Sequence, residues 1–418
     1  GGLYIEDAGP LIINSNIAYN SSVSGGGVYV KSNIPSTIEN TSIHHNQATG
    51  SYPNGGGGIR SGGYFGYNTI APVLLDLDLH NNFSSTGAAI FYSNVTGTIE
   101  DVEIHHHYDN NINSIFKMHG PAWSDNVVIN DIYFHDNING NGSTLFDIES
   151  SHPIINGCVI TNNTIGNIIR FSQRSLTNLN NVIISNNISE NIISINGSNN
   201  NPQLQNIIIA DNTGVGFNIL GGSNFNLNVN NGLFYKIAGG IGIVNNGPVN
   251  LTNLTIAENG SLANNGVEGF SVETYGSVII SESNIFNNGT AIYNNDTTTT
   301  TALENNYWGH SSGPYHPTQN TSGQGDSLSI FTDADPWLNG PSIDAHISPP
   351  KNTYKVVLNN ELILSWSPNS ESDIAGYKVH YGHFNGYSYE TTVDVGNVTS
   401  YTLSGVNDNS NISVSAYD

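Results

Sequence analysis

The chain repeats itself with a period of roughly 24 residues, and this repeat limits what it can fold into more than any other feature. Each repeat holds one phrase in which apolar and polar residues alternate before a turn, and a second alternating phrase that often begins with Gly. The first phrase reads INSNIAYN (13–20), ENTSIHHN (39–46), LDLDLHNN (75–82), EDVEIHHH (100–107) and NDIYFHDN (130–137), and it recurs as far as SESNIFNN (281–288). The second reads GGGVYV, GGGGIR, GAAIFY, SIFKMH and TLFDIE in the early repeats.

A unit this short, built of strands and turns, cannot bury its apolar residues alone, so the repeats must stack as rungs of a solenoid. Parallel strands of neighbouring rungs lie about 4.8 Å apart, so about eleven or twelve rungs make a rod roughly 55 Å long. Strict alternation and the lack of a helical period favour an all-β chain. We therefore predict a parallel β-helix over residues 1–340.

The pairing of Gly-Gly-x-aliphatic with a phrase ending in Asn resembles the repeats of polymorphic outer-membrane proteins and adhesins. More broadly, it resembles right-handed parallel β-helices of the pectate-lyase-like superfamily. The segment NNYWGHSSGPYHPTQNTSGQGDSLSIFTDADPWL (305–338) is similar to the closing segment of many secreted β-helices. The resemblance implies a right-handed β-helix, but the superfamily contains lyases, hydrolases, epimerases, phage spikes and adhesins, so it leaves the activity open.

The repeat stops after SIDAHISPP (342–350), and we take 341–350, with its Pro-Pro pair, as a linker. Residues 351–418 resemble a fibronectin type III domain, a small β-sandwich, with Trp366 and Tyr377 as its core aromatics. Seven strands need about 90 residues, so we expect a last strand to lie beyond Asp418.

The Gly-Gly start is typical of a processed chain, and an uncapped first rung would permit end-to-end association into a filament.

The charge balance excludes several classes of partner. The chain has 9 Lys+Arg against 33 Asp+Glu and a net charge of -24, whereas nucleic acids and anionic membranes require clustered basic residues. No run reaches the roughly 18 apolar residues of a membrane helix. The single cysteine, Cys158, cannot form an intrachain disulfide and reads as a buried apolar residue. We expect an extracellular or cell-surface location, without membrane insertion of this segment.

Two outward columns of side chains follow from the alternation. One column runs through Ser42, Asp78, Glu103 and Tyr133, and its neighbour runs through His44, His80, His105 and His135. His106 continues a turn column with His45, Asn81 and Asp136, whereas His107 has no counterpart and is expected to be solvated. The outward residues are candidate ligands for a glycan, and His80, His105 and His135 are candidate ligands for a divalent metal, with Asp78 or Glu103 supplying oxygen.

The opposing interpretation is that the histidine column has no function. Duplication of the repeat would then simply have copied one residue type at an exposed position. A further hypothesis is that the stacked histidines lose their protons together and change the surface charge below about pH 6, because like charges repel. Asparagine forms a separate column, just before a strand, which we expect to point inward and to satisfy backbone groups at a turn. Its members are Asn14, Asn40, Asn181, Asn206, Asn231 and Asn253, and it becomes Asp76, Asp101 and Asp131 in rungs three to five, where we favour a solvated turn position.

The second strand of each repeat presents a competing face. Its outward column contains Tyr29, Arg60, Phe91, Lys117, Asp147, Arg170 and Ser194, and the next column contains His119 and Glu149. Polysaccharide lyases with similar β-helices use a Lys or Arg base, often with Ca²⁺, so the resemblance makes Lys117 and Arg170 candidate catalytic residues. Glycoside hydrolysis requires two carboxylates, for which Asp147 and Glu149 are the candidates here. Tyr29, Phe91 and Trp123 would suit sugar stacking, and segments 47–73 and 106–126 flank the same rungs.

The chain has about sixteen N-x-[ST] sequons, a number close to chance for an Asn-rich sequence. The candidate glycosylation sites are Asn20, Asn40, Asn82, Asn94, Asn141, Asn162, Asn187, Asn196, Asn250 and Asn253.

These observations favour an extracellular structural or adhesive β-helix protein that binds glycans or other cell-surface proteins through a polar face. Ca²⁺ or another divalent cation is the only cofactor that the sequence suggests. The alternative is a carbohydrate-active enzyme, a polysaccharide lyase or a glycoside hydrolase, acting on an extracellular polysaccharide. A deep groove would favour the enzyme, and a smooth rod would favour the adhesin.

Overall fold

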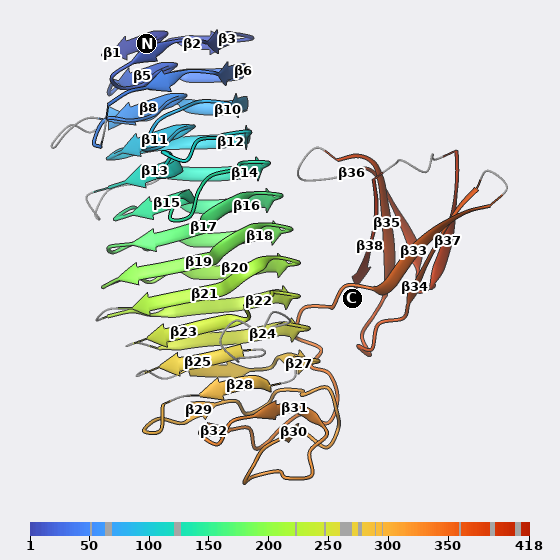
Figure 1. Ribbon diagram of the computed structural model, residues 1–418. Helices are drawn as coiled ribbons and strands as arrows, with labels where there is room; N and C mark the ends of the chain where they lie inside the picture. Colours follow the sequence, from blue (N-terminus) through green and yellow to red (C-terminus); the bar gives the residue numbers. More distant parts are fainter. Residues whose placement is uncertain are drawn as a thin grey trace.

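The computed structural model describes residues 1–50, 52–62, 69–120, 127–221, 224–245, 248–259, 270–274, 278–288, 290–294, 296–358, 361–384, 389–405 and 411–418. Within these ranges the regular structure is entirely β, without a helix, as predicted. The repeats stack into a parallel β-solenoid of about 10 turns, slightly fewer than we expected, with short strands at both ends (Figure 1). None of the described residues forms a helix long and apolar enough to span a bilayer.

One long sheet, with 14 strands, is built from the Gly-led phrases. In spatial order its strands are β1 (Leu3–Glu6), β5 (Val28–Lys31), β8 (Ile59–Gly62), β11 (Ile90–Ser93), β13 (Ser114–His119), β15 (Thr144–Glu149), β17 (Thr164–Ser172), β19 (Ile188–Gly197), β21 (Thr213–Gly221), β23 (Ile241–Asn245), β25 (Phe270–Thr274), β28 (Thr290–Asn294), β31 (Gly325–Leu328) and β30 (Pro314–Tyr315).

The other long sheet, with 16 strands, is built from the phrases that end in a turn. Its main path is β2 (Leu11–Ile13), β6 (Thr37–His44), β10 (Val73–His80), β12 (Val95–His105), β14 (Val127–His135), β16 (Ile154–Thr161), β18 (Asn178–Ser185), β20 (Gln203–Ala210), β22 (Leu227–Tyr235), β24 (Val249–Ala257), β26 (Val278–Ser281), β29 (Thr301–Ala302) and β32 (Thr332–Asp333). The strands β3 (Asn16–Ala18), β9 (Thr69–Ile70) and β27 (Asn284–Phe286) join its side, and β4 (Ser21–Ser22) pairs with β7 (Gln47–Ala48).

The strand register agrees with the alignment of the repeats. Leu77 pairs with Val102 and Asp78 with Glu103, so residues at the same position of successive repeats are neighbours. Side chains that alternate inward are fully buried and stack along the rod axis; Phe116 and Phe146, for example, are parallel with ring centroids 4.7 Å apart. Each rung therefore gains its core from the rungs on either side, as a unit too small to fold alone requires.

The predicted asparagine column does not point inward. Its members, and the aspartates that replace them, adopt left-handed backbone angles, with φ of 44° at Asn40, 51° at Asp76 and 53° at Asp131. Asn40, Asp76 and Asp131 are exposed. Asn and Asp tolerate this conformation better than other non-Gly residues. The column is a repeated left-handed bend inside the strand, and our inward assignment was wrong, whereas the expected turn position of the aspartates agrees with their exposure.

The inward asparagine ladder lies one turn further along each repeat. Asn163 shows its pattern: Oδ1 accepts from the backbone N–H of Asn137 at 3.1 Å, and Nδ2 donates to the carbonyl of Phe134 at 3.1 Å. Each amide thus satisfies backbone groups that the sheet leaves free at the turn. The members with this buried position are Asn46, Asn82, Asn137, Asn163, Asn187, Asn212, Asn259 and Asn288.

His107 occupies one place in this ladder. Its side chain is 0% exposed, and its Nδ1 lies 3.0 Å from Asn137 Oδ1. The expectation of a solvated side chain was wrong because the residue follows the left-handed turn residue His106, the place where other repeats put an inward asparagine. Nε2 finds no hydrogen-bond partner among the described residues.

The C-terminal residues form two antiparallel sheets, each with 3 strands. One contains β33 (Lys351–Leu358), β34 (Glu361–Ser367) and β37 (Ser400–Ser404), and the other contains β36 (Tyr389–Gly396), β35 (Gly376–Phe384) and β38 (Ile412–Tyr417). Trp366 and Tyr377 are buried between them with ring centroids 5.4 Å apart, in the core role we predicted. These strands lie beside the solenoid, beyond Pro349 and Pro350 (Figure 1).

Candidate ligand-binding face

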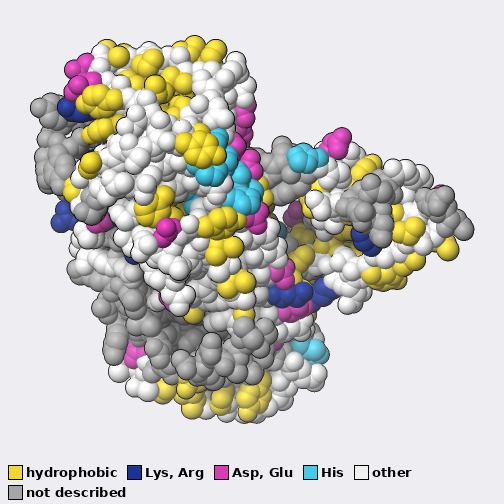
Figure 2. Space-filling model, turned by 45° about the horizontal axis from the view of Figure 1, so that its top comes forward, with side chains coloured by type: hydrophobic (Ala, Val, Ile, Leu, Met, Phe, Trp, Pro, Cys, Tyr) yellow, Lys and Arg dark blue, Asp and Glu magenta, His cyan; other side chains and the backbone are white. Residues whose placement is uncertain are grey.

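The four stacked histidines are the last residues of four adjacent strands, β6, β10, β12 and β14. We call His44, His80, His105 and His135 the histidine strip. The register places each directly beside the next, and their rings stack with centroid distances of 4.6, 5.1 and 4.8 Å. Figure 2 shows histidine side chains gathered in a cyan patch bordered by carboxylates on this part of the solenoid. The strip is the outward column that the sequence predicted.

The residue after each strip histidine adopts a left-handed conformation, which ends the strand and turns its side chain back towards the strip. His44 Nδ1 lies 2.8 Å from His45 Nδ1, and Asn81 Nδ2 donates to His80 Nδ1 at 3.0 Å. The rings of His105 and His106 also meet through their Nδ1 atoms, and His135 Nδ1 lies 2.8 Å from Asp136 Oδ2. The same edge of every strip histidine therefore faces a polar turn residue.

The opposite edge faces two carboxylates. His105 Nε2 lies 2.8 Å from Asp78 Oδ1, and His135 Nε2 lies 2.6 Å from Glu103 Oε1. His80 Nε2 is further away, at 3.6 Å from Asp78 Oδ2. Each carboxylate comes from the preceding rung, so histidines and carboxylates interleave along the strip.

The electrostatic environment changes along the strip. Burial lowers the pKa of His44 and of His80 below the ordinary value, and Asp78 only partly opposes this effect. Burial also acts on His135, but the hydrogen bonds to Glu103 and Asp136 outweigh it and raise its pKa. These opposite directions indicate that His135 takes up a proton at a higher pH than His44 and His80 do, and joint titration of the strip stays a hypothesis.

A shallow acidic groove of about 590 Å³ runs beside the strip on the same sheet. We define it by Asp76, Asp78, Asp101 and Glu103, with Tyr133 at one end. Burial and the neighbouring charges of Asp131, Glu100 and Asp76 raise the pKa of Asp101. The His105 hydrogen bond overcomes burial and lowers the pKa of Asp78. The groove thus concentrates negative charge and attracts cationic groups.

The second predicted face has the expected register but is not an open surface. Lys117 is 5% exposed and Asp147 is 2% exposed. Asp147 accepts from Lys117 at 2.8 Å and takes two hydrogen bonds from Arg170, at 3.0 and 2.7 Å. Lys117 also forms a very short contact with Glu149. The candidate catalytic residues are therefore partners in one largely buried ion network.

The aromatics of this face are engaged as well. Phe91 is buried, and the guanidinium of Arg60 lies 4.8 Å from its ring centre and 5.3 Å from that of Tyr29. Tyr52, from the loop that follows β7, contacts Phe91 and His119. The loop therefore packs on the column that we had expected to be open for sugar stacking. Trp123 lies outside the described residues.

The ion network does not supply the protonation states that hydrolysis needs. The neighbouring imidazole of His119, whose Nδ1 lies 3.7 Å from the carboxylate, and then the charge of Lys117 lower the pKa of Glu149 to about 2. A general acid needs a raised pKa, so Glu149 is unsuited to that role. Lys117 Nζ is already paired with two carboxylates, Asp147 and Glu149, so it is not open to a substrate as a lyase base would be.

Two of the predicted glycan acceptors are inside the molecule. Asn82 and Asn187 are 2% and 1% exposed and belong to the inward ladder, so the folded chain cannot carry a glycan on either, and those two assignments are withdrawn. Asn40, Asn141 and Asn162 are exposed. The remaining sequon asparagines are partly exposed: Asn20, Asn94, Asn196, Asn250 and Asn253.

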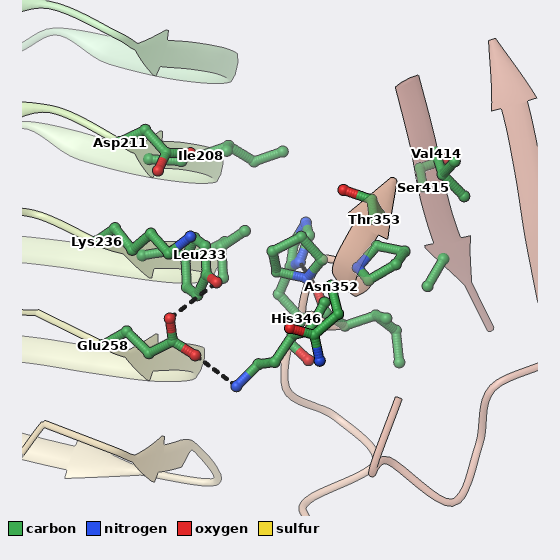
Figure 3. Close-up of a pocket in the computed structure, with 18 residues that line it drawn as sticks. Ile208, Asp211, Leu233, Lys236, Glu258, His346, Asn352, Thr353, Val414 and Ser415 are labelled. Carbon is green, nitrogen blue, oxygen red and sulfur yellow. Dashed lines mark hydrogen bonds and ion pairs between the residues drawn. The ribbon is translucent and has the colours of Figure 1, made fainter. Parts of the chain in front are cut away.

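The sequence did not indicate a pocket of about 520 Å³ where the solenoid meets the chain around 346–353 and 414–416 (Figure 3). Glu258 links its two sides: Tyr235 donates to the carboxylate at 3.0 Å, and Lys351 pairs with it at 2.5 Å. These charged groups satisfy one another, so they hold the junction together. The histidine strip remains the better candidate for ligand binding.

The sequence also missed the contribution of His45, whose ring joins the strip from the turn. The signal was present in the His-His pair at 44–45, because the residue after a strand end turns its side chain back. Comparison of the chain with protein-family models, with curated proteins and with solved structures found no match.

Proposed function

We propose that this chain is an adhesive or structural β-helix, secreted or displayed at a cell surface, that binds an extracellular glycan through the histidine strip and the acidic groove. The observation that carries the proposal is the regular four-rung column of outward histidines and carboxylates beside a shallow groove. A flat polar strip with stacked rings matches an extended ligand that runs across several rungs.

The charge of the face selects the class of glycan. The groove carries four carboxylates, and the whole chain has a net charge of -24. An anionic polysaccharide would be repelled, whereas a neutral or amino-sugar polymer would not. The strip imidazoles stack on one another and Tyr133 stacks on His135, so a bound sugar would meet ring edges and carboxylates. The C-terminal sheets, which resemble a fibronectin type III domain, suit a display module.

A glycan-binding screen of the purified chain in EDTA tests this proposal. The variant Asp78→Asn/Glu103→Gln removes two groove charges, and Glu190→Gln/Glu361→Gln removes two exposed charges elsewhere as a matched control. We expect binding to a neutral or amino-sugar polymer that the first variant weakens at least about tenfold, corresponding to about 1.4 kcal/mol, while the control leaves it unchanged. Equal binding by all three proteins would contradict the proposed face.

A carbohydrate-active enzyme is the second candidate, and one observation favours it. Two His–carboxylate pairs, His105 with Asp78 and His135 with Glu103, lie at hydrogen-bonding distance on the open strip and have the form of acid–base pairs. A depolymerisation screen that detects new reducing ends or unsaturated uronates, with and without Ca²⁺ and Zn²⁺, separates the two functions. Turnover abolished by His105→Ala would replace adhesion with catalysis.

A further inference from the structure

Metal-ligating atoms converge at two places on the histidine strip. His44, His45 and His80 each offer one ligand atom, and these atoms lie within 4.8 Å of one another; the same holds for Glu103, His105 and His135. The sequence had suggested His80, His105 and His135 as one set of ligands. The structure instead divides the four strip histidines between two sets of different composition.

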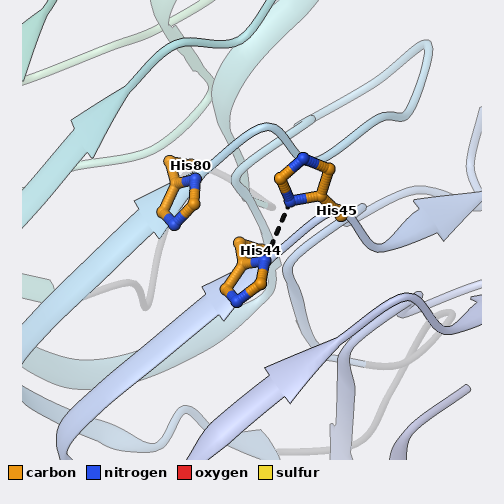
Figure 4. A group of neighbouring side chains, drawn as sticks. All are labelled: His44, His45 and His80. Atoms are coloured by element: carbon orange, nitrogen blue, oxygen red, sulfur yellow. Dashed lines mark hydrogen bonds between the residues drawn. The ribbon is translucent and has the colours of Figure 1, made fainter.

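The first set contains only imidazoles (Figure 4). His44 and His80 come from adjacent parallel strands and stack with an interplanar angle of 11°, and His45 approaches edge-on from the turn. The Nδ1 atoms of His44 and His45 face each other at 2.8 Å. At this distance one ring donates its N–H to the other, and a metal ion could replace that proton and take both nitrogens as ligands.

The second set mixes nitrogen and oxygen. Glu103 Oε1 lies 2.6 Å from His135 Nε2, and the rings of His105 and His135 are parallel with centroids 4.8 Å apart. Asp78, at 2.8 Å from His105 Nε2, adds a further oxygen beside the set. Two imidazoles with one or two carboxylates are a donor set that zinc accepts.

The distances fit a zinc-sized ion. Zinc–nitrogen bonds of about 2.0–2.1 Å in a tetrahedron place neighbouring ligand atoms roughly 3.4 Å apart. The first set spans this value, from 2.8 Å between His44 and His45 to the 4.8 Å limit. Small rotations of partly exposed side chains are enough to equalise the distances, and the backbone beneath them is fixed by the parallel register.

Neighbouring groups already orient the rings. Asn81 donates to His80 Nδ1, which marks that nitrogen as an acceptor with a lone pair, while Asp78 lies on the Nε2 side. In the second set Asp136 holds His135 Nδ1 and leaves Nε2 facing Glu103. Such outer contacts fix the tautomer and raise the basicity of metal-binding histidines.

We propose that the histidine strip binds two transition-metal ions of the zinc class, one at His44, His45 and His80 and one at Glu103, His105 and His135. Imidazole ligands favour zinc, copper and nickel over Ca²⁺ and Mg²⁺, which take oxygen ligands. The proposal deepens the proposed function, because it assigns a ligand to the same face. Three protein ligands on an open strip leave a fourth position for water or for a donor atom of a bound partner.

Calorimetric titration of the EDTA-treated full chain with Zn²⁺, in excess Ca²⁺, tests the inference. His45→Asn removes a ligand from the first set only, and Asn is already present at the matching left-handed position Asn81. Glu103→Gln removes a ligand from the second set only. His152→Asn, which changes a partly exposed histidine outside both sets, is the control.

We expect about two Zn²⁺ per wild-type chain and per control chain, and about one per chain for each ligand variant, with an affinity loss of about tenfold or more at the altered site. A stoichiometry that neither variant changes, a single ion lost in both variants, or the lack of zinc binding by the wild type would each overturn the two-site assignment. If the chain fails the zinc test but binds a glycan in EDTA, the proposed function stands and only the metal sites are refuted. If it binds zinc but no glycan, only the proposed function is refuted.

Discussion

A single residue position decides whether a histidine of this chain belongs to the surface or to the core. His105, His106 and His107 are consecutive, yet the first ends a strand and points outward, the second takes the left-handed turn, and the third is buried in the asparagine ladder. Burial lowers the pKa of His107 to about 3, although its hydrogen bond to Asn137 partly opposes the shift. His107 is therefore neutral in the folded chain over most of the accessible pH range.

His107 should make the chain sensitive to acid. The unfolded chain takes up a proton near pH 6.5 and the folded chain only near 3, so stability is complete above about 6.5 and falls as the pH drops towards 3. At about pH 4.5 this one residue costs about 3 kcal/mol. His107→Asn restores the ladder residue, and we expect it to raise the thermal midpoint at pH 4.5 much more than at pH 7.5. Equal shifts at both values would contradict the assignment.

The raised pKa of His135 depends on its two carboxylate neighbours. We expect Glu103→Gln to lower the pKa of His135, because burial of the ring remains while one opposing charge is lost. The protonated ring contributes stability below its ordinary pKa, and this contribution disappears as the pH rises through the raised value. NMR titration of the imidazole resonances in EDTA measures the shift. Asp211→Asn, on another rung, is the control and should leave His135 unchanged.

At the scale of one element, adjacent asparagines of the same turn have different roles. Asn162 adopts the left-handed conformation with φ of 57° and is exposed, whereas Asn163 is buried in the ladder. Asn163 ties the ends of strands β14, β16 and β18 together. Its side chain bonds to the N–H of Asn137 and the carbonyl of Phe134, and its own N–H donates to Asn187 Oδ1 on the next rung. The turn therefore depends on one asparagine for its backbone angle and on the other for its hydrogen bonds.

This division predicts unequal effects of two neighbouring substitutions. Asn162→Gly should change the free energy of unfolding by no more than about 0.5 kcal/mol, because Gly adopts positive φ freely. Asn163→Ala leaves the N–H of Asn137 and the carbonyl of Phe134 unpaired and should cost about 2–5 kcal/mol. Urea unfolding of both variants against the wild type checks the contrast. Similar losses of unfolding free energy in the two variants would contradict this division between backbone angle and hydrogen bonding.

The ion network of β13, β15 and β17 should contribute to folding and not to chemistry. Asp147→Ala leaves Lys117 and Arg170 without their shared carboxylate, and breaking a buried pair costs about 3–5 kcal/mol. Glu149→Gln, at a more exposed partner, should cost less. We expect the urea midpoint to fall more for Asp147→Ala than for Glu149→Gln. Under conditions in which both variants are folded, glycan binding should be unchanged. An Asp147→Ala chain that keeps its stability but no longer binds the glycan would show that this face takes part in binding.

The sequence predicted the solenoid and the strip because both depend on the period of the repeat. It did not predict that the second face is covered, because Tyr52, which contacts Phe91 and His119, comes from an irregular loop whose path the repeat does not determine. It also misplaced the asparagine ladder by one turn. Alternation alone cannot tell that the residue at Asn40 takes a left-handed angle, which shifts the inward positions that follow it.

For the molecule as a whole, the scarcity of positive charge controls what can approach it. The chain has 9 basic side chains against 33 acidic ones, and several of the basic ones are already paired, including Lys31, Lys117, Arg170 and Lys351. Long-range attraction of an anionic polymer is therefore weak over the whole surface, whatever groups it would meet on contact. The histidine strip can add positive charge only by taking up protons or metal ions.

This charge balance predicts that the class of bound glycan depends on metal. In EDTA the chain should not bind immobilised polygalacturonate at any salt concentration from about 50 to about 500 mM, because screening over about 10 Å removes repulsion without creating attraction. Saturating Zn²⁺ should allow binding, and His45→Asn/Glu103→Gln should abolish that gain while the His152→Asn control retains it. Tight, salt-sensitive binding in EDTA would instead require a basic surface. The ion pairs of Lys117 and Arg170 with Asp147 would then have to break in solution to expose these cations.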